Sequence, residues 1–150
     1  MSQSLAKIYV HIVFSTKYRQ HLISNDIEAD LHAFLGGIAN QMECNPIKVG
    51  GFTDHIHILC MLSKKVALMD LMEELKRESS KWVKQKISGY NDFYWQRGYG
   101  AFSIREREIA TVTKYIANQK NHHTKVSFQD EYRSILKHHH VDYDERYIWD

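Results

Sequence analysis

The run from His55 to Leu62, His-Ile-His-Ile-Leu-Cys-Met-Leu, restricts the fold of this chain more than any other segment. It is rich in β-branched and apolar residues and predicts a strand, in which side chains two apart point to the same face. Because Leu59 and Met61 continue the histidine face and isoleucines begin the other, both faces are apolar, which is typical of a central strand. The two imidazoles should therefore emerge side by side, close enough to share one metal ion, while Ile56 points into a core.

The other segments give strand-like and helix-like patterns. We expect strands at residues 7–14, 47–52, 55–62 and 99–104, and helices at residues 26–43, 66–87, 105–122 and 128–138. Gly36-Gly37 weakens the prediction of the first helix, since each glycine costs about 1 kcal/mol against alanine there. The order strand, helix, strand, strand, helix, strand predicts an α+β, ferredoxin-like split βαβ fold with a four-stranded antiparallel sheet. Right-handed crossovers would put the first and third strands at its centre, with two helices on one face. The other face would be left for a ligand, a partner or the third helix.

Length and composition favour one domain over residues 1–150. A chain of this length can bury a real core, and 43% hydrophobic with 25% charged residues is ordinary for a globular protein. No apolar run approaches the roughly 20 residues of a membrane span, and residues 1–7 lack the apolar stretch of a signal peptide. Cys44 and Cys60 are too few for a disulfide or zinc framework and are interpreted as buried, reduced thiols. We therefore expect a cytoplasmic protein without a membrane partner.

Positive charge is concentrated locally. The formal net charge is only +2, but a surface that binds nucleic acid needs local charge rather than a basic chain. Lys17 and Arg19 follow the first strand, and Lys76, Arg77 and Lys81 lie on the second helix. We expect these five side chains to contact phosphates.

The histidine pair becomes a candidate catalytic site only with further groups, because an isolated His-x-His is more often structural. Tyr115 and Gln119, four residues apart, share one face of the third helix at the border of its apolar stripe. Any one of the nine tyrosines is more often a core residue. Two imidazoles with one amide oxygen, however, would form a mixed nitrogen and oxygen site suited to Mg²⁺ or Mn²⁺ and phosphate. The metal would polarise a phosphate oxygen and place the phosphorus in line with the phenol. A phosphotyrosine formed in this way keeps the bond energy, so rejoining needs no ATP.

The neighbouring polar residues have two or more interpretations each. Asp54 would orient a metal-bound imidazole or simply form a turn. His11, on the first strand beside the third, would orient the ligands, contact DNA, or only belong to the sheet. His122-His123 and residues 138–140 are interpreted as surface histidines.

Three segments resemble the HUH single-tyrosine transposases (TnpA-like) of small insertion sequences that move as single-stranded DNA, including repeat-associated tyrosine transposases. The name refers to His-hydrophobic-His. Residues 11–19 resemble the first strand and basic turn of that family, residues 54–59 its metal strand, and residues 115–119 its nucleophile helix. Residues 95–96 and 99–103 also resemble the approach to the fourth strand of that family. The resemblance runs in the same order along nearly the whole chain and is weakest over residues 131–150.

The resemblance implies a ferredoxin-like fold with a C-terminal nucleophile helix and an obligate homodimer. It implies that Tyr115 is the nucleophile and that His55, His57 and Gln119 hold Mg²⁺ or Mn²⁺. It implies single-stranded or hairpin DNA as partner, cut on one strand to leave a 5′-phosphotyrosine and a free 3′-hydroxyl. Whether Tyr115 serves the metal site of its own chain or of a partner stays open, as does a mobile-element or settled host role.

Three other interpretations remain. A rolling-circle initiator or plasmid relaxase shares the metal strand, but relaxases place the tyrosine before the histidines, and initiators usually carry a second tyrosine or a helicase domain. A catalytically idle or domesticated protein that only binds hairpin DNA would not need the intact tyrosine and ligands. A small ferredoxin-like dimer with another ligand is the least specific possibility.

Overall fold

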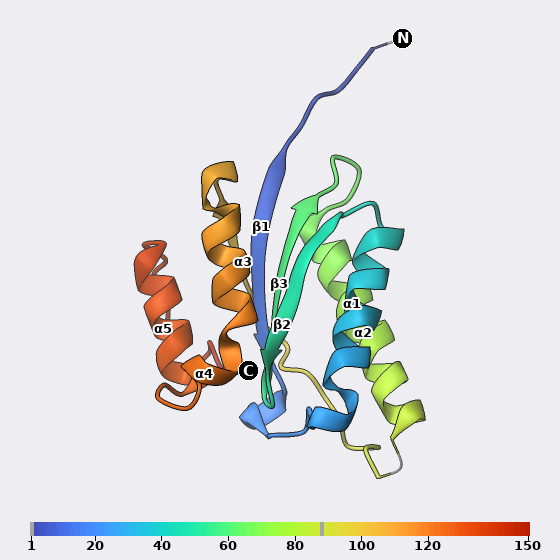
Figure 1. Ribbon diagram of the computed structural model, residues 1–150, viewed down its shortest axis with the longest axis vertical. Helices are drawn as coiled ribbons and strands as arrows, with labels where there is room; N and C mark the ends of the chain where they lie inside the picture. The colour runs from blue at the N-terminus through green and yellow to red at the C-terminus, as the bar shows by residue number, and fades with distance from the viewer. Residues whose placement is uncertain (1, 88) are drawn as a thin grey trace.

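The computed structural model describes residues 2–87 and 89–150 and is built on a four-stranded antiparallel sheet (Figure 1). Its strands are β1 (Ile8–Ser15), β2 (Pro46–Phe52), β3 (His55–Leu62) and β4 (Gly100–Ile104). The strand order is β2-β3-β1-β4, and every neighbouring pair is antiparallel. The ferredoxin-like arrangement is confirmed, with β1 and β3 at the centre, and the predicted strand ends differ by one residue at most.

Helices α1 (Asn25–Gln41) and α2 (Leu68–Lys86) cover one face of the sheet, as expected. Leu35 from α1 and Leu75 from α2 are fully buried against Ile56 and Ile58 of β3 in the main core. Gly36-Gly37 does not interrupt α1. The buried residues on either side anchor the helix, so tertiary packing outweighs its weak local propensity.

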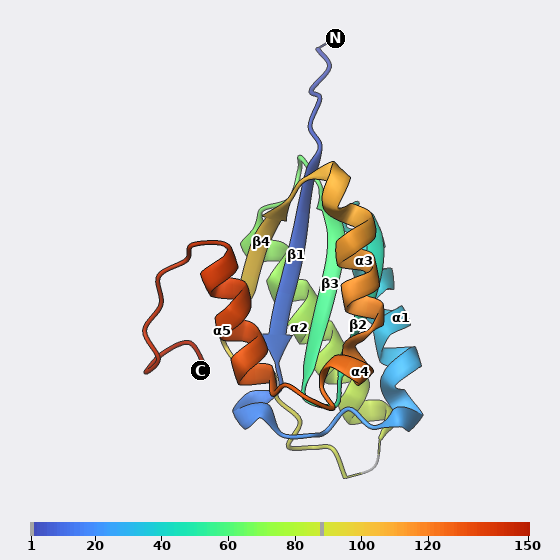
Figure 2. The same ribbon diagram turned by 60° about the vertical axis from the view of Figure 1, so that its left-hand side comes forward.

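The opposite face carries α3 (Ile109–Ala117), α4 (Gln119–His122) and α5 (Phe128–His138), as Figure 2 shows. Beneath α3, Ile116 packs with Leu59 of β3. Gly50 permits this approach, because a Cβ there would lie 2.6 Å from Ile116 Cγ2 and 2.9 Å from its carbonyl oxygen. Beneath α5 the sheet contributes two residues of a second apolar cluster, whose buried members are Val13, Phe102, Phe128, Tyr132 and Leu136.

The third helix is not continuous over residues 105–122 as expected. A 3-10 turn, η2 (Glu106–Glu108), precedes α3, and Asn118 separates α3 from α4. Asn118 has φ −97° and ψ 17°, and its N–H donates to the carbonyls of Lys114 (3.0 Å) and Tyr115 (3.3 Å). The chain therefore changes direction there, and Tyr115 and Gln119 lie on different helices. Among the described residues no helix is long and apolar enough to cross a membrane.

Candidate active site and metal centre

The histidine pair lies at the start of β3, directly after the turn that joins β2 to β3. His55 pairs with Ser15 and His57 with Val13 of β1, and both imidazoles are fully buried. Their ring centroids are 5.0 Å apart on the face under α3, α4 and α5. Ile56 belongs to the core on the other side. The alternation expected of a central strand is therefore present.

Each of the two imidazoles is held through Nδ1. His55 Nδ1 donates to Asp54 Oδ1 at 2.7 Å, and His57 Nδ1 lies 2.8 Å from Nε2 of the buried His11. Burial, followed by the neighbouring His57, lowers the pKa of His11 to about 3, so this ring is neutral. Asp54 and His11 thus occupy positions behind the pair, where side chains orient imidazoles, and both Nε2 atoms face the site.

Gln119 and Tyr115 reach this cluster within the same chain. Gln119 is buried, and its Oε1 accepts from His55 Nε2 at 2.8 Å. The Tyr115 ring, half-buried, lies edge-on to His57 with centroids 5.7 Å apart. Burial, together with a nearby carboxylate, raises the pKa of Tyr115 above its usual value. The bend at Asn118 permits both contacts, because it turns α4 toward His55 while α3 stays on the sheet.

That carboxylate is Glu131 of α5, which the sequence reading missed. Glu131 is 2% exposed, and its Oε1 lies 3.1 Å from His57 Nε2 and 3.3 Å from His55 Nε2. Its Oε2 accepts from the Tyr115 hydroxyl and from Gln119 Nε2. Burial raises its pKa, but hydrogen bonds from His123, His55 and His57 outweigh burial and hold the pKa below its usual value. A signal was available, since Glu131 falls within the apolar stripe of α5, three residues after Phe128.

His123 is also part of the site, so the expectation that it lies on the surface is wrong. Its side chain is 3% exposed, and its Nε2 lies 2.9 Å from Gln119 Oε1 and 3.1 Å from Glu131 Oε1. Its ring packs against those of His55 and Phe52, and its Nδ1 donates to the Val126 carbonyl at 2.7 Å. Local periodicity places His123 on an exposed helix, but the bend at Asn118 brings it over the end of β3.

The donors present fit a divalent cation. His55, His57 and Glu131 offer ligand atoms that all lie within 4.8 Å of one another, and Gln119 Oε1 contacts the same group. Burial lowers the pKa of His55, but hydrogen bonds to Asp54 and Glu131 outweigh it and raise the pKa to about 9. Of these two carboxylates, Glu131 faces Nε2, where a bound cation would take the place of the proton. Imidazole, amide and carboxylate ligands together suit ions such as Mn²⁺ or Mg²⁺.

Two of the expected phosphate contacts lie at the same end of the sheet. Lys17 and Arg19 form the 3-10 turn η1 (Lys17–Arg19) that follows β1. The N–H of Thr16 donates to the carbonyl of Asp54 at 2.9 Å, which ties this turn to the start of β3. Arg19 also donates to the Trp149 carbonyl and lies over the Trp149 ring.

The three basic residues of α2 are not brought to the site. The ammonium group of Lys76 donates to the carbonyls of residues 96, 97 and 98 at 2.7, 3.0 and 2.6 Å, and burial lowers its pKa to about 8. Arg77 and Lys81 are exposed on the opposite layer. Each lies within ion-pair distance of glutamates on the same helix.

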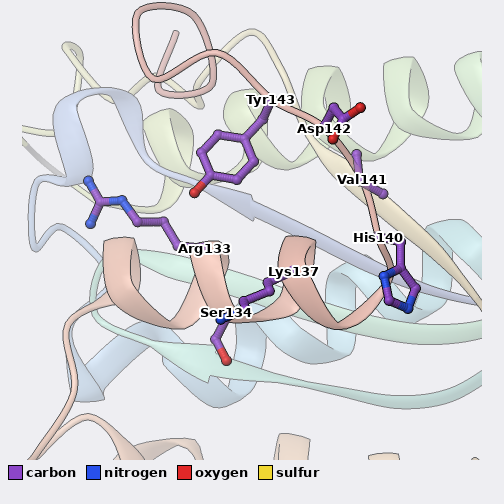
Figure 3. A pocket seen from close by; sticks show the side chains of 7 residues that line it. All are labelled: Arg133, Ser134, Lys137, His140, Val141, Asp142 and Tyr143. Carbon is purple, nitrogen blue, oxygen red and sulfur yellow. The ribbon is translucent and has the colours of Figure 1, made fainter.

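Two hollows flank α5. One, of about 550 Å³, lies between α3 and α5 and is lined by His11, Tyr115 and Glu131 as well as by the end of α5. The other, of about 810 Å³, lies between α5 and the tail that follows it, and its lining includes Arg133, Lys137 and Tyr143 (Figure 3). Only the first opens onto the cluster described above.

Comparison with known proteins identifies the family of this chain. The model of the family described as "Transposase IS200 like" matches residues 4–119. The chain belongs to this family. Two relatives are the ISDra2 transposase TnpA of Deinococcus radiodurans and the transposase for insertion sequence element IS200 of Salmonella typhimurium. The first is 27% identical over 116 residues, covering 73% of this chain and 81% of the relative. The second is 25% identical over 114 residues, covering 73% of this chain and 74% of the relative.

Solved structures show the same fold for this IS200-like transposase chain. A putative transposase from Deinococcus radiodurans R1 aligns with a TM-score of 0.62 and 22% identity, covering 79% of this chain and 98% of the other. A REP-associated tyrosine transposase bound to a REP hairpin aligns with a TM-score of 0.61 and 14% identity, covering 84% of this chain and 76% of the other. The IS200-like match ends at Gln119, so His123 and Glu131 lie beyond it.

Proposed function

We propose that this IS200-like chain is a metal-dependent transposase that cleaves and rejoins single-stranded DNA through a 5′-phosphotyrosine at Tyr115. One observation carries the proposal. The Tyr115 hydroxyl, the Nε2 atoms of His55 and His57, and Gln119 meet in one cluster, linked by the Glu131 carboxylate.

His55, His57 and Gln119 would hold Mg²⁺ or Mn²⁺. When bound, the ion polarises an oxygen of the scissile phosphate and neutralises charge that develops there. The protein contributes orientation. Asp54 and His11 fix the two rings through Nδ1, so that neither Nε2 has to be reoriented before a ligand arrives.

Tyr115 would attack the phosphorus. A phenol is a weak nucleophile while protonated, and burial here raises its pKa further. Its proton therefore needs an acceptor, and Glu131 Oε2 already accepts its hydrogen bond. The new bond joins the tyrosine oxygen to phosphorus, and the bond from phosphorus to the 3′-oxygen breaks. The 3′-oxygen leaves as a hydroxyl after taking up a proton, and attack by a 3′-hydroxyl on the phosphotyrosine reverses the sequence.

The DNA partner is proposed to be a single strand that carries a hairpin. Lys17 and Arg19 support this, because they place positive charge at the end of the sheet where β3 begins. The solved REP-associated relative is bound to a hairpin, which also favours this substrate. A homodimer remains part of the proposal on the strength of the resemblance.

The test is a cleavage assay on a hairpin-bearing single strand labelled on the 3′ side of the cut. We expect the label to stay on the denatured protein when Mg²⁺ or Mn²⁺ is present, and to be absent with a chelator. Tyr115→Phe should bind the hairpin without forming this adduct. Adduct formation by Tyr115→Phe would refute the nucleophile, and full cleavage in the chelator would refute metal dependence. Hairpin binding by wild type with no cleavage under any metal would favour the idle hairpin-binding alternative.

A further inference from the structure

We propose that His123 and Glu131 complete the ligand set of the metal, giving a centre of three imidazoles, one amide and one carboxylate that prefers Mn²⁺ to Mg²⁺. This rests on the proposed function only in that a metal binds at His55, His57 and Gln119. It adds two ligands from the part of the chain beyond the family match, and a choice of ion.

The first support is the spacing of the donor atoms. Glu131 Oε1 lies 3.3, 3.1 and 3.1 Å from the Nε2 atoms of His55, His57 and His123. Gln119 Oε1 lies 2.8 and 2.9 Å from the Nε2 atoms of His55 and His123. Adjacent ligands of a six-coordinate ion with bonds of about 2.1 Å are themselves about 3.0 Å apart. All five separations lie close to that value. Glu131 belongs to both groups of ligand atoms that lie within 4.8 Å of one another, one with His55 and His57 and one with His122 and His123, so it links His123 to the histidines of β3.

The second support is the orientation of the three rings. Nδ1 of His123 donates to the Val126 carbonyl, Nδ1 of His55 donates to Asp54, and Nδ1 of His57 contacts His11. Each ring is therefore fixed through Nδ1 and presents Nε2 to Glu131 Oε1. An imidazole ligand that is held through its other nitrogen is the usual arrangement in protein metal sites. His123 has this arrangement as fully as the two histidines of β3.

The third support is the charge of the cluster. Glu131 is buried, and among the described residues its ion-pair partners are all histidines, with no lysine or arginine within 4.0 Å. A buried charge is costly unless it is paired. A divalent cation in contact with Oε1 would pair with the carboxylate, while Oε2 still faces Tyr115.

The ligand set favours a transition metal. Mg²⁺ binds mostly oxygen and keeps several waters, whereas imidazole suits first-row transition ions. Two imidazoles leave room for either ion, but three imidazoles with two oxygens leave one position on a six-coordinate ion. That position would serve a phosphate oxygen, and Mg²⁺ would have to exchange most of its water for nitrogen.

Metal binding without DNA tests this proposal. Free Mn²⁺ is measured by electron paramagnetic resonance during titration of purified protein, and Mg²⁺ is then added as a competitor. The variants are His123→Asn and Glu131→Gln, with His57→Asn as the positive control. The matched control is His138→Asn, which removes an exposed imidazole of α5 outside the cluster.

We expect His123→Asn and Glu131→Gln to lose at least about tenfold in Mn²⁺ affinity, while His138→Asn binds as wild type. His123→Asn should also narrow the preference for Mn²⁺ over Mg²⁺, and pulsed measurements on bound Mn²⁺ should show fewer coupled nitrogens than in wild type. Thermal melts without metal establish that each variant is folded. If Glu131→Gln is not, Glu131→Asp, which draws the carboxylate back by one methylene, replaces it with the same expectation.

The outcomes separate this inference from the proposed function. Wild-type Mn²⁺ affinity in both His123→Asn and Glu131→Gln, together with loss in His57→Asn, overturns the inference and leaves the smaller ligand set intact. Equal affinity of wild type for Mg²⁺ and Mn²⁺ overturns the preference. Unchanged binding in His57→Asn would overturn the metal site itself, whatever the cleavage assay shows.

Discussion

The Tyr115 hydroxyl donates a hydrogen bond to the carboxylate of Glu131, sixteen residues further along the same chain. Glu131 in turn contacts the Nε2 atoms of His55 and His57. One carboxylate from α5 therefore connects the tyrosine of α3 with the histidines of β3. The nucleophile and the metal strand meet without a second subunit, and this makes the arrangement of subunits open to experiment.

Subunit mixing tests that arrangement. Tyr115→Phe and His57→Ala each remove one half of the site. Because the structure brings both halves together within one chain, a mixture of the two variants should stay inactive even if dimers form, since every subunit carries a defect. The measurement is the yield of covalent adduct after the two proteins are unfolded and refolded together. Recovery of a substantial fraction of wild-type adduct would show that the helix is exchanged between subunits.

The salt dependence of DNA binding tests which of the predicted basic residues contact phosphates, and Lys17 and Lys81 are compared. Lys17→Ala should make the log–log salt slope of single-strand binding shallower by about 0.7, the effect of one phosphate contact. Lys81→Ala is the comparison, because Lys81 is exposed on the layer opposite the site. Hairpin titrations at several salt concentrations give both slopes. Equal changes for the two variants would mean that DNA also contacts α2.

Lys76 should matter for stability. Lys76→Met keeps the apolar stem but leaves three backbone carbonyls without their donor, which should cost about 1–3 kcal/mol in the free energy of unfolding. The adjacent Arg77→Ala removes only exposed ion pairs and should change it by less than about 0.5 kcal/mol. Urea unfolding measures both. Weaker hairpin binding by Lys76→Met at unchanged stability would instead support the phosphate contact expected from the sequence.

Gly50 should be intolerant of a side chain. In Gly50→Ala the new Cβ would meet Ile116, including its backbone oxygen, so α3 must move off β2. We expect a loss of about 1–3 kcal/mol in stability and a lower adduct yield, because Tyr115 moves with α3. Gly37→Ala is the control, since nothing lies within 4 Å of its Cβ and alanine favours a helix by about 0.5–1 kcal/mol. A Gly50→Ala protein as stable as Gly37→Ala would contradict the close packing.

The sequence was sufficient for features set by local periodicity or chain order. Alternation along β3 placed both histidines on one face, and the order of elements gave the sheet topology. The bend at Asn118 has no proline or glycine to mark it, and it results from packing over the end of β3. Glu131 enters the site because α5 folds back across the sheet, and His123 because the chain bends at Asn118. The position of Glu131 in the apolar stripe of α5 indicates that its side chain is buried, but not which residues it contacts.

The apolar contact between α5 and the sheet has a consequence for related chains that are shorter. A copy ending where the family match ends, at Gln119, would keep Tyr115 and the pattern by which such proteins are recognised. It would lack Phe128, Tyr132 and Leu136, and Val13 and Phe102 would then be left uncovered on the sheet. An uncovered apolar patch promotes association between molecules. Such copies should therefore aggregate when expressed, although their sequences look catalytically complete.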